Sequence, residues 1–290
     1  MTETQAWTNK RLLDWTTEHF TDKGFEGGRL DAEILLAEAL GCQRIQLYTQ
    51  FNEVPEEARL ATFRDWVKRR AKGEPVAYLV GHKEFYSLSF EVNSNVLIPR
   101  PETEHIVVQA VDLAKGFSPH CSILDVGTGS GCIAVTLAKQ IENAQLVAVD
   151  ISSDALEVAQ RNANKHEVQE RIEFMQSDLL ASVPGDRKFD LIISNPPYIG
   201  TKEEGTVDES VRQYEPAVAL FSGDDGTDAI RGLVQQSAQR LNAGGFLVFE
   251  TSPIIFDACL GIVSESGAFA EPETIKDYSG HRRIISAKLR

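Results

Sequence analysis

The stretch ILDVGTGSG, Ile123–Gly131, decides the fold of this chain. Its first four residues form an apolar run broken only by Asp125 and predict a buried strand, and the glycines that follow predict a tight turn. The run CIAVTLA, Cys132–Ala138, then predicts a helix. Glycines let the backbone approach a ligand closely, and the start of a helix supplies unpaired N–H groups. We therefore predict a ligand site at this turn.

The spacing around the turn indicates which ligand it takes. Asp150 ends the next apolar strand, about 20 residues on, where an acid that binds ribose is expected. The glycines read G-x-G-x-G, which differs from the G-x-G-x-x-G of dinucleotide folds, and no Lys-Ser/Thr pair follows as in a P-loop. The pattern favours a nucleoside without a pyrophosphate, such as S-adenosylmethionine. A tight turn without a ligand is the plainer alternative, which the position of Asp150 disfavours.

Strands and helices alternate after residue 121, which predicts a parallel sheet covered on both faces. The last two strands, 268–276 and 282–289, are separated by too few residues for a crossover helix and must be antiparallel. A parallel sheet with a terminal antiparallel hairpin is typical of Rossmann-like S-adenosylmethionine-dependent methyltransferases. The predicted strands are 122–126, 145–149, 171–176, 188–194 and 245–250, and the predicted helices are 131–140, 153–165, 227–241 and 254–266.

The part before this sheet has a different pattern. Apolar residues at helical spacing predict a small all-α bundle over residues 1–75. Alternation around Tyr86–Val92, together with the apolar run 76–80, predicts a β-hairpin linker over 76–98. The methyltransferase domain is then expected over 99–290. The basic cluster at 68–72 is interpreted first as a solvated helix face and second as a protein-docking patch.

The tetrapeptide NPPY, Asn195–Tyr198, follows an apolar strand and carries the second motif. Neither proline can donate to a strand ladder, so the strand stops here and a stiff loop begins. This loop offers an amide side chain, free carbonyl groups and a phenol ring, which together suit a planar amide or amino group. A simple strand-terminating turn is the alternative.

Composition excludes several classes of protein. The 290 residues are 42% hydrophobic and 25% charged, as in an ordinary soluble protein. We find no secretory signal, no membrane-length apolar run, no C-x-x-C pair and no metal-binding histidine spacing, and we expect a cytoplasmic protein without structural metal. Nearly all of the net charge of −14 lies after residue 90, which disfavours stable binding of nucleic acid.

With these motifs the chain resembles, nearly end to end, the HemK/PrmC family of peptide-chain release factor glutamine methyltransferases. The most specific shared runs are RRAKGEPVAYL (69–79) and LIPRPETE (97–104), and the others are RLDAE (29–33), SNPPYI (194–199) and the segment from 215 to 226. Family members usually have Ile-Gly after the strand that ends at Glu250, whereas this chain has Thr251-Ser252-Pro253. This departure concerns the wall near Glu250.

The resemblance implies a set of site residues, a cofactor and a partner. S-adenosylmethionine would bind and leave as S-adenosylhomocysteine, and class 1 release factors would be the substrate, docked with help from the helical bundle. Asn195, Pro196, Pro197 and Tyr198 would hold the glutamine of the factor's Gly-Gly-Gln loop. The cofactor would lie against Gly127, Thr128, Gly129, Ser130, Gly131, Asp150, Asp178, Leu179 and Asn195.

Alternatives from other substrate classes remain. The same tetrapeptide can grip a flipped-out adenine, but an enzyme acting on nucleic acid would be expected to show basic surface. A glutamine methyltransferase for a ribosomal protein is a second alternative, and a noncatalytic binding module is a third. Among these hypotheses we favour transfer of a methyl group to the release factor glutamine. Asn195 and Pro196 would accept the amide N–H groups.

Overall fold

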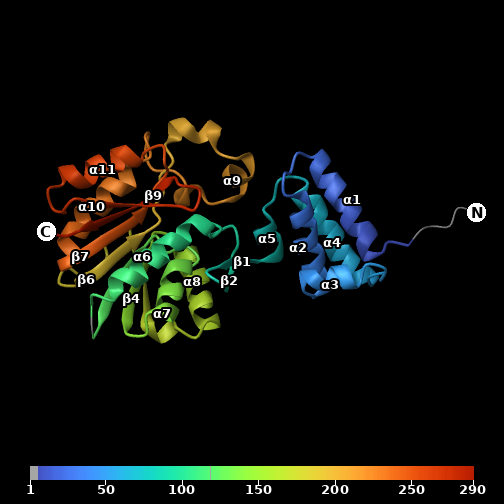
Figure 1. The fold of residues 1–290 in the computed structure, drawn as a ribbon, viewed down its shortest axis with the longest axis horizontal. Coiled ribbons are helices and arrows are strands. Elements are labelled where there is room, and N and C mark those ends of the chain that lie inside the picture. Colours follow the sequence, from blue (N-terminus) through green and yellow to red (C-terminus); the bar gives the residue numbers. More distant parts are fainter. Residues whose placement is uncertain (1–5, 118) are drawn as a thin grey trace, which may run out of the picture. The chain divides into compact units, whose positions relative to one another are not determined.

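A computed structural model describes residues 6–117 and 119–290, and the chain divides into two compact units. The helical unit contains the chain up to Gly81 together with Glu209–Tyr214. The sheet unit contains His82–Asp208 and Glu215–Arg290. Each unit is described by itself (Figure 1).

The helical unit is the bundle that the apolar spacing predicts. Its core is made mainly of buried leucines with two phenylalanines, Phe20 and Phe63, and Leu13, Phe20 and Leu36 are at 0% exposure. The Thr8 side chain accepts a hydrogen bond from the first turn of α1, and Gly41 ends α2 in the left-handed conformation. The helices are α1 (Asn9–Asp22), α2 (Gly28–Leu40), α3 (Arg44–Thr49), α4 (Glu57–Arg70), α5 (Val76–Val80) and α9 (Glu209–Tyr214).

Two features of this unit differ from expectation. The run Val76–Val80 is helix α5 and not a strand of the hairpin, so that part of the prediction is wrong. A five-residue apolar run carries no periodicity that separates strand from helix. Helix α9 is contributed by a distant part of the chain, and the Tyr214 hydroxyl donates to the Lys72 carbonyl at 3.2 Å.

The two arginines of the basic cluster at the end of α4 are paired with acids inside the helical unit. Arg70 donates to Asp31 at 2.8 Å and lies over the Phe25 ring. Arg69 forms ion pairs with Glu74 and Asp65. These partners favour a structural role for both arginines over a docking patch.

The sheet unit contains a seven-stranded sheet in the order β5-β4-β3-β6-β7-β9-β8. Strands β3 to β7 pair in parallel, whereas β9 pairs antiparallel with both β7 and β8. The prediction of a parallel sheet closed by an antiparallel hairpin is therefore confirmed. The strands are β3 (Cys121–Val126), β4 (Ala144–Asp150), β5 (Ile172–Gln176), β6 (Phe189–Ser194), β7 (Leu241–Glu250), β8 (Glu273–Lys276) and β9 (Arg282–Lys288).

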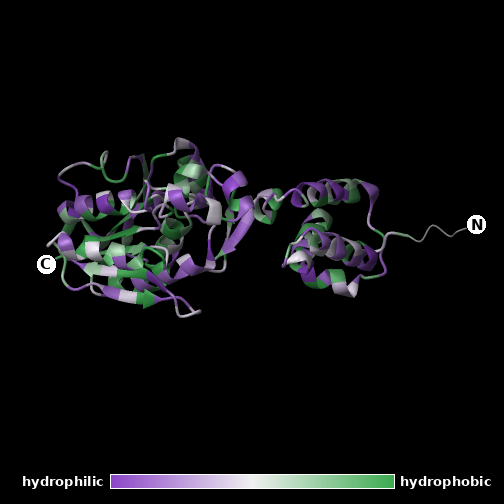
Figure 2. Ribbon diagram, turned by 90° about the horizontal axis from the view of Figure 1, so that it is seen from above, coloured by the Kyte–Doolittle hydropathy of each residue, from purple (hydrophilic) through white to green (hydrophobic). Residues whose placement is uncertain are grey.

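Helices cover both faces of this sheet, with α6, α7 and α8 on one face and α10 and α11 on the other (Figure 1). Hydrophobic residues concentrate in the strands, and the helices carry polar residues outward (Figure 2). Each face buries its own apolar cluster, because the parallel strands are apolar on both sides. The helices are α6 (Glu104–Ala114), α7 (Cys132–Gln140), α8 (Ser153–Lys165), α10 (Asp228–Arg240) and α11 (Phe256–Glu265).

The short hairpin of β1 (His82–Phe85) and β2 (Leu88–Glu91) belongs to the sheet unit. The Asn162 side chain of α8 pairs with the backbone N–H and C=O of Glu91 at 2.7 and 3.0 Å. Glu104 accepts a hydrogen bond from the Tyr86 N–H at the hairpin turn. The hairpin that we expected as a linker is thus fastened to the methyltransferase sheet, and the two units separate just before it.

Candidate active site

The glycine turn forms an open cradle at the carboxyl edge of the sheet. The N–H groups of Gly127 and Thr128 donate to the Val149 carbonyl at 2.8 and 2.9 Å, which ties the turn to the end of β4. Gly127 and Gly129 have φ of +71° and +55°, and a Cβ built on either would meet no atom within 4 Å. No atom therefore covers the backbone on the Cβ side of these two glycines, and a ligand can contact it directly.

Two aspartates flank this turn, and their hydrogen-bond partners differ. Asp150 accepts N–H groups from Gly129 at 2.8 Å and from Ser152 at 2.9 Å. Burial raises the pKa of Asp150, and these backbone N–H groups act in the opposite direction. Asp125 is fully buried and accepts from the Thr128 hydroxyl at 2.7 Å, and burial raises the pKa of Asp125 to about 7.

Gly131, the third glycine of the turn, contributes to helix packing. A Cβ on Gly131 would lie 3.0 Å from the Ala159 Cβ, so this glycine lets α7 approach α8 closely. Gly131 does not line the cavity, whereas Asp178 and Leu179 do. Leu179 is held at a positive φ of 48° on the cavity wall.

The tetrapeptide begins where β6 ends beside β3. The Ser194 hydroxyl donates to the Val126 carbonyl at 2.8 Å, which fixes the two strand ends together. Asn195, Pro196 and Pro197 line the cavity. In the part of the chain that the structure describes, no residue donates a hydrogen bond to the Pro196 carbonyl oxygen. That oxygen is therefore available as an acceptor. This agrees with the prediction that the two prolines end the strand ladder and leave free carbonyl groups in the loop.

Tyr198 is placed differently from its neighbours. Its ring packs against the buried cluster under α10 and α11 and does not line the cavity. Its hydroxyl donates to Glu250 Oε1 at 3.3 Å, and burial raises the pKa of Tyr198. The role of this ring on the substrate amide stays a prediction.

A buried chain of hydrogen bonds lies behind Asn195. The Asn195 Nδ2 donates to Thr103 Oγ1 at 3.1 Å, and that hydroxyl donates to Glu250 Oε2 at 2.7 Å. Thr103 and Glu250 are 2% and 1% exposed. Burial raises the pKa of Glu250, and the hydrogen bond from Thr103 lowers it. Because the amide nitrogen of Asn195 is engaged, its carbonyl oxygen Oδ1 is left as the free acceptor.

A second wall of the cavity joins two runs that the chain shares with the family. Glu215 is buried and accepts from the Ile98 N–H at 3.1 Å and from Arg100. These bonds join the segment before α6 to the segment that contains Pro216 and Val218, and both segments line the cavity. Both runs are among those shared with the family, 97–104 as a specific one and 215–226 as another, and Glu215 itself was not predicted as a site residue.

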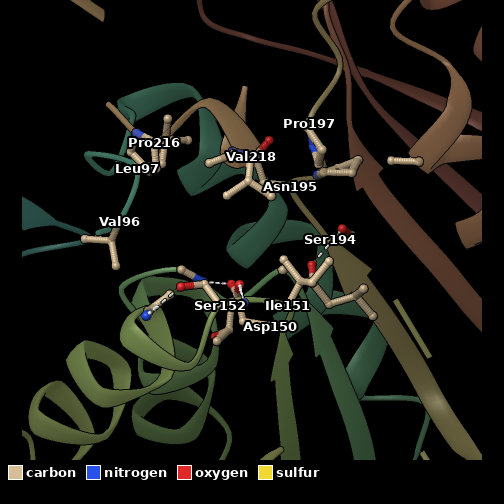
Figure 3. A pocket seen from close by; sticks show the side chains of 18 of the residues that line it. Val96, Leu97, Asp150, Ile151, Ser152, Ser194, Asn195, Pro197, Pro216 and Val218 are labelled. Atoms are coloured by element: carbon tan, nitrogen blue, oxygen red, sulfur yellow. Dashed lines mark hydrogen bonds between the residues drawn. The ribbon is translucent and has the colours of Figure 1, made fainter. Parts of the chain in front are cut away.

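These elements enclose one cavity of about 440 Å³, a volume within the usual range of small-ligand sites. Figure 3 shows Asp150 and Ser152 on one side of it and Asn195 and Pro197 across from them. The structure thus brings Gly127, Thr128, Gly129, Ser130, Asp150, Asp178, Leu179, Asn195, Pro196 and Pro197 to one cavity, and leaves Gly131 and Tyr198 outside its lining.

Thr251, where family members usually have isoleucine, is held by local bonds. Thr251 is buried, its N–H donates to the Arg283 carbonyl at 2.8 Å, and its hydroxyl contacts the Cys259 sulfur at 3.3 Å. Thr251 and the two residues after it do not line the cavity. Glu250 does not line the cavity either, so the departure lies outside the cavity lining.

Among residues 6–117 and 119–290, no group of three or more His, Cys, Asp or Glu side chains could hold a metal ion. Within those same ranges, the helices are all too short or too polar to cross a membrane.

Comparison with known folds supports the architecture. The chain is similar to the hMettl16 catalytic domain solved in complex with an RNA hairpin, with a TM-score of 0.57 at 14% identity over 78% of this chain and 82% of that one. It is also similar to a T. thermophilus 16S rRNA methyltransferase solved with AdoMet and guanosine, with a TM-score of 0.52 at 20% identity over 72% of this chain and 50% of that one. At these identities the likeness shows the fold alone.

Sequence comparison shows the family. Residues 11–81 match the PrmC N-terminal domain, and residues 106–213 match the methyltransferase small domain. A release factor glutamine methyltransferase of Rhodopirellula baltica is 50% identical over 97% of this chain and 96% of its own length. One of Geobacter sulfurreducens is 42% identical over 98% of both chains. The chain therefore belongs to the family of release factor glutamine methyltransferases.

Proposed function

We propose that this protein transfers a methyl group from S-adenosylmethionine to the side-chain amide nitrogen of a glutamine in the Gly-Gly-Gln loop of class 1 peptide-chain release factors. The observation that carries the proposal is the state of Asn195, whose nitrogen is bonded to Thr103 while its carbonyl oxygen is left free beside the cavity. An acceptor pair of Asn195 Oδ1 and the Pro196 carbonyl matches the two N–H groups of a carboxamide.

The other side of the cavity fits the nucleoside part of S-adenosylmethionine. The bare backbone at Gly127 and Gly129 allows close approach, and Asp150 retains acceptor capacity beyond its two backbone bonds. Asp178 and Leu179 would lie along the adenine. When bound, S-adenosylmethionine supplies an electrophilic methyl group on a sulfonium sulfur and is left as S-adenosylhomocysteine.

The residues of the tetrapeptide would orient the amide and stabilise the charge that develops on it. An amide nitrogen is a weak nucleophile, because its lone pair is delocalised into the carbonyl group. Two acceptors on its N–H groups aim the lone pair and offset positive charge on nitrogen as the new N–C bond forms. The methylated nitrogen then loses one proton to water. Fixed orientation of this kind is worth up to about 7–11 kcal/mol in favourable cases.

Release factors act in translation, so we expect the reaction in the cytoplasm, with no stable nucleic acid or membrane partner. The acidic balance of the chain after residue 90 supports a protein substrate over a phosphate backbone.

Label transfer from radioactive S-adenosylmethionine tests the proposal. We expect label on a class 1 release factor, none on a ribosomal protein or duplex DNA, and none on the factor when its loop glutamine is replaced. Asn195→Ala should lower kcat by about 10²–10³-fold with little change in cofactor affinity. Asn143→Ala is the matched control, because Asn143 bonds to Pro119 outside the cavity and should keep full turnover. Label on DNA or on the ribosomal protein alone would overturn the proposal.

A further inference from the structure

We infer that Thr103 and Glu250 are positioning residues that fix which end of the Asn195 amide faces the substrate. This inference rests on the proposed function, because it concerns the role of Asn195 in that reaction. It starts from an ambiguity in the residue itself. An asparagine side chain has an acceptor end and a donor end of nearly the same shape, and only the acceptor end can bind a carboxamide N–H.

The direction of the hydrogen bonds resolves the ambiguity. Glu250 accepts from Thr103 Oγ1 through Oε2 and from the Tyr198 hydroxyl through Oε1. In the structure the Thr103 hydroxyl donates to Glu250 Oε2, so its only hydrogen is committed to that oxygen. The Thr103 oxygen can then only accept from Asn195, and it therefore selects the Nδ2 end at 3.1 Å.

Burial makes this selection strong. Thr103 is 2% exposed and Glu250 is 1% exposed, so water does not compete for the bonds between them. A flipped Asn195 would place its carbonyl oxygen against the Thr103 oxygen, with no hydrogen between the two acceptors. An unsatisfied buried polar group costs about 1–3 kcal/mol, enough to keep the amide in one orientation.

The three residues come from three separate segments that meet only in the folded sheet unit. Thr103 lies just before α6, Glu250 ends β7, and Asn195 follows β6. Strands β6 and β7 are paired neighbours, with Ser194 opposite Phe249, so their carboxyl ends bring Asn195 and Glu250 to the same edge. The chain of bonds therefore ties the loop that starts at Asn195 to the end of β7 and to the segment before α6.

Two substitutions break the selection in different ways. Thr103→Val keeps the side-chain shape but removes the oxygen that accepts from Asn195. Glu250→Gln keeps the shape and adds a donor, because its amide nitrogen, when it faces Thr103, donates to that hydroxyl. The Thr103 hydroxyl would then donate to Asn195 and turn its nitrogen toward the substrate.

Steady-state methyl transfer to a release factor tests the inference. Thr103→Val and Glu250→Gln should each lower kcat by about 10–100-fold, with KM for the factor and Kd for S-adenosylmethionine changed by less than about 3-fold. Thr103→Ser retains the hydroxyl and should keep kcat within about 3-fold of the wild type. In an Asn195→Ala background, Thr103→Val should lower kcat by less than about 2-fold further, because both act through one group.

Thr136→Val is the matched control. Thr136 is a fully buried threonine of α7 that bonds to the Cys132 carbonyl and does not line the cavity, so its loss should leave kcat unchanged. If the wild type methylates the factor and Asn195→Ala does not, but Thr103→Val and Glu250→Gln keep wild-type kcat, the positioning role is refuted while the proposed function stands. If the wild type transfers no methyl group to any release factor, the proposed function itself fails. Should Thr103→Val not fold, Thr103→Ala, which also removes the accepting oxygen, takes its place.

Discussion

Replacing Gly226 by alanine tests the stiffness of the loop that carries Asn195. Gly226 has φ of +80°, and a Cβ there would lie 2.4 Å from the Tyr198 carbonyl oxygen. The segment just after Tyr198 cannot give way easily, because Ile199 is bonded on both sides to Leu220 and Ser222. The new methyl group must therefore displace the tetrapeptide or its neighbour.

The cost has two parts that a second glycine separates. A left-handed φ costs an ordinary residue roughly 1–2 kcal/mol, and the steric overlap adds about 1–3 kcal/mol. Gly280 has φ of +83° in the β8–β9 turn, and a Cβ there meets nothing within 4 Å. Gly280→Ala should therefore lower the free energy of unfolding only by the cost of the left-handed φ. Gly226→Ala should lower it by that cost and by the cost of the steric overlap.

Urea unfolding of both variants measures the difference, and methyl transfer measures its effect on the site. We expect Gly226→Ala to be less stable than Gly280→Ala by about 1–3 kcal/mol. A shift of the reacting groups by about 1 Å can cost about 10²-fold in rate, so kcat should fall in Gly226→Ala and stay unchanged in Gly280→Ala. Equal unfolding free energies and equal kcat for the two variants would refute a rigid loop.

Two further substitutions concern the aspartates beside the glycine turn. Asp150→Asn should weaken S-adenosylmethionine binding by about 10–100-fold in calorimetric titration, because one charged acceptor is lost; unchanged affinity would exclude Asp150 from the cofactor site. Burial raises the pKa of Asp125 from 3.8 to about 7, so the unfolded chain loses this proton first and the folded protein loses stability as pH rises from about 4 to about 7. Asp125→Asn should lack that loss and gain up to roughly 4 kcal/mol over the wild type across this range, whereas parallel pH curves in urea unfolding would contradict the assignment.

Much of the sheet unit could be predicted from the sequence, because its signals are long and local. The helix predicted over 153–165 is observed as Ser153–Lys165, where Ser152 accepts the first-turn N–H of Ala155. The terminal antiparallel hairpin followed from a connection too short for a crossover. Both motifs end strands of a parallel sheet, so their meeting at one edge was also predictable.

Features that depend on contacts between distant residues could not be predicted. Thr103 is 92 residues from Asn195 and 147 from Glu250, and no spacing in the sequence indicates that these side chains bond. The apolar run 76–80 is too short to show a period, and it folded as α5 instead of a strand. The place of α9 in the helical unit likewise depends on tertiary contacts, among them the bond from Tyr214 to Lys72.

A crystal structure with S-adenosylhomocysteine and a peptide containing the Gly-Gly-Gln loop tests the central claim most directly. We predict that the glutamine Nε2 lies about 2.7–3.2 Å from both Asn195 Oδ1 and the Pro196 carbonyl oxygen. In that structure Asn195 Nδ2 should remain bonded to Thr103. A glutamine whose carbonyl oxygen faces Asn195, or whose nitrogen contacts neither acceptor, would contradict the account.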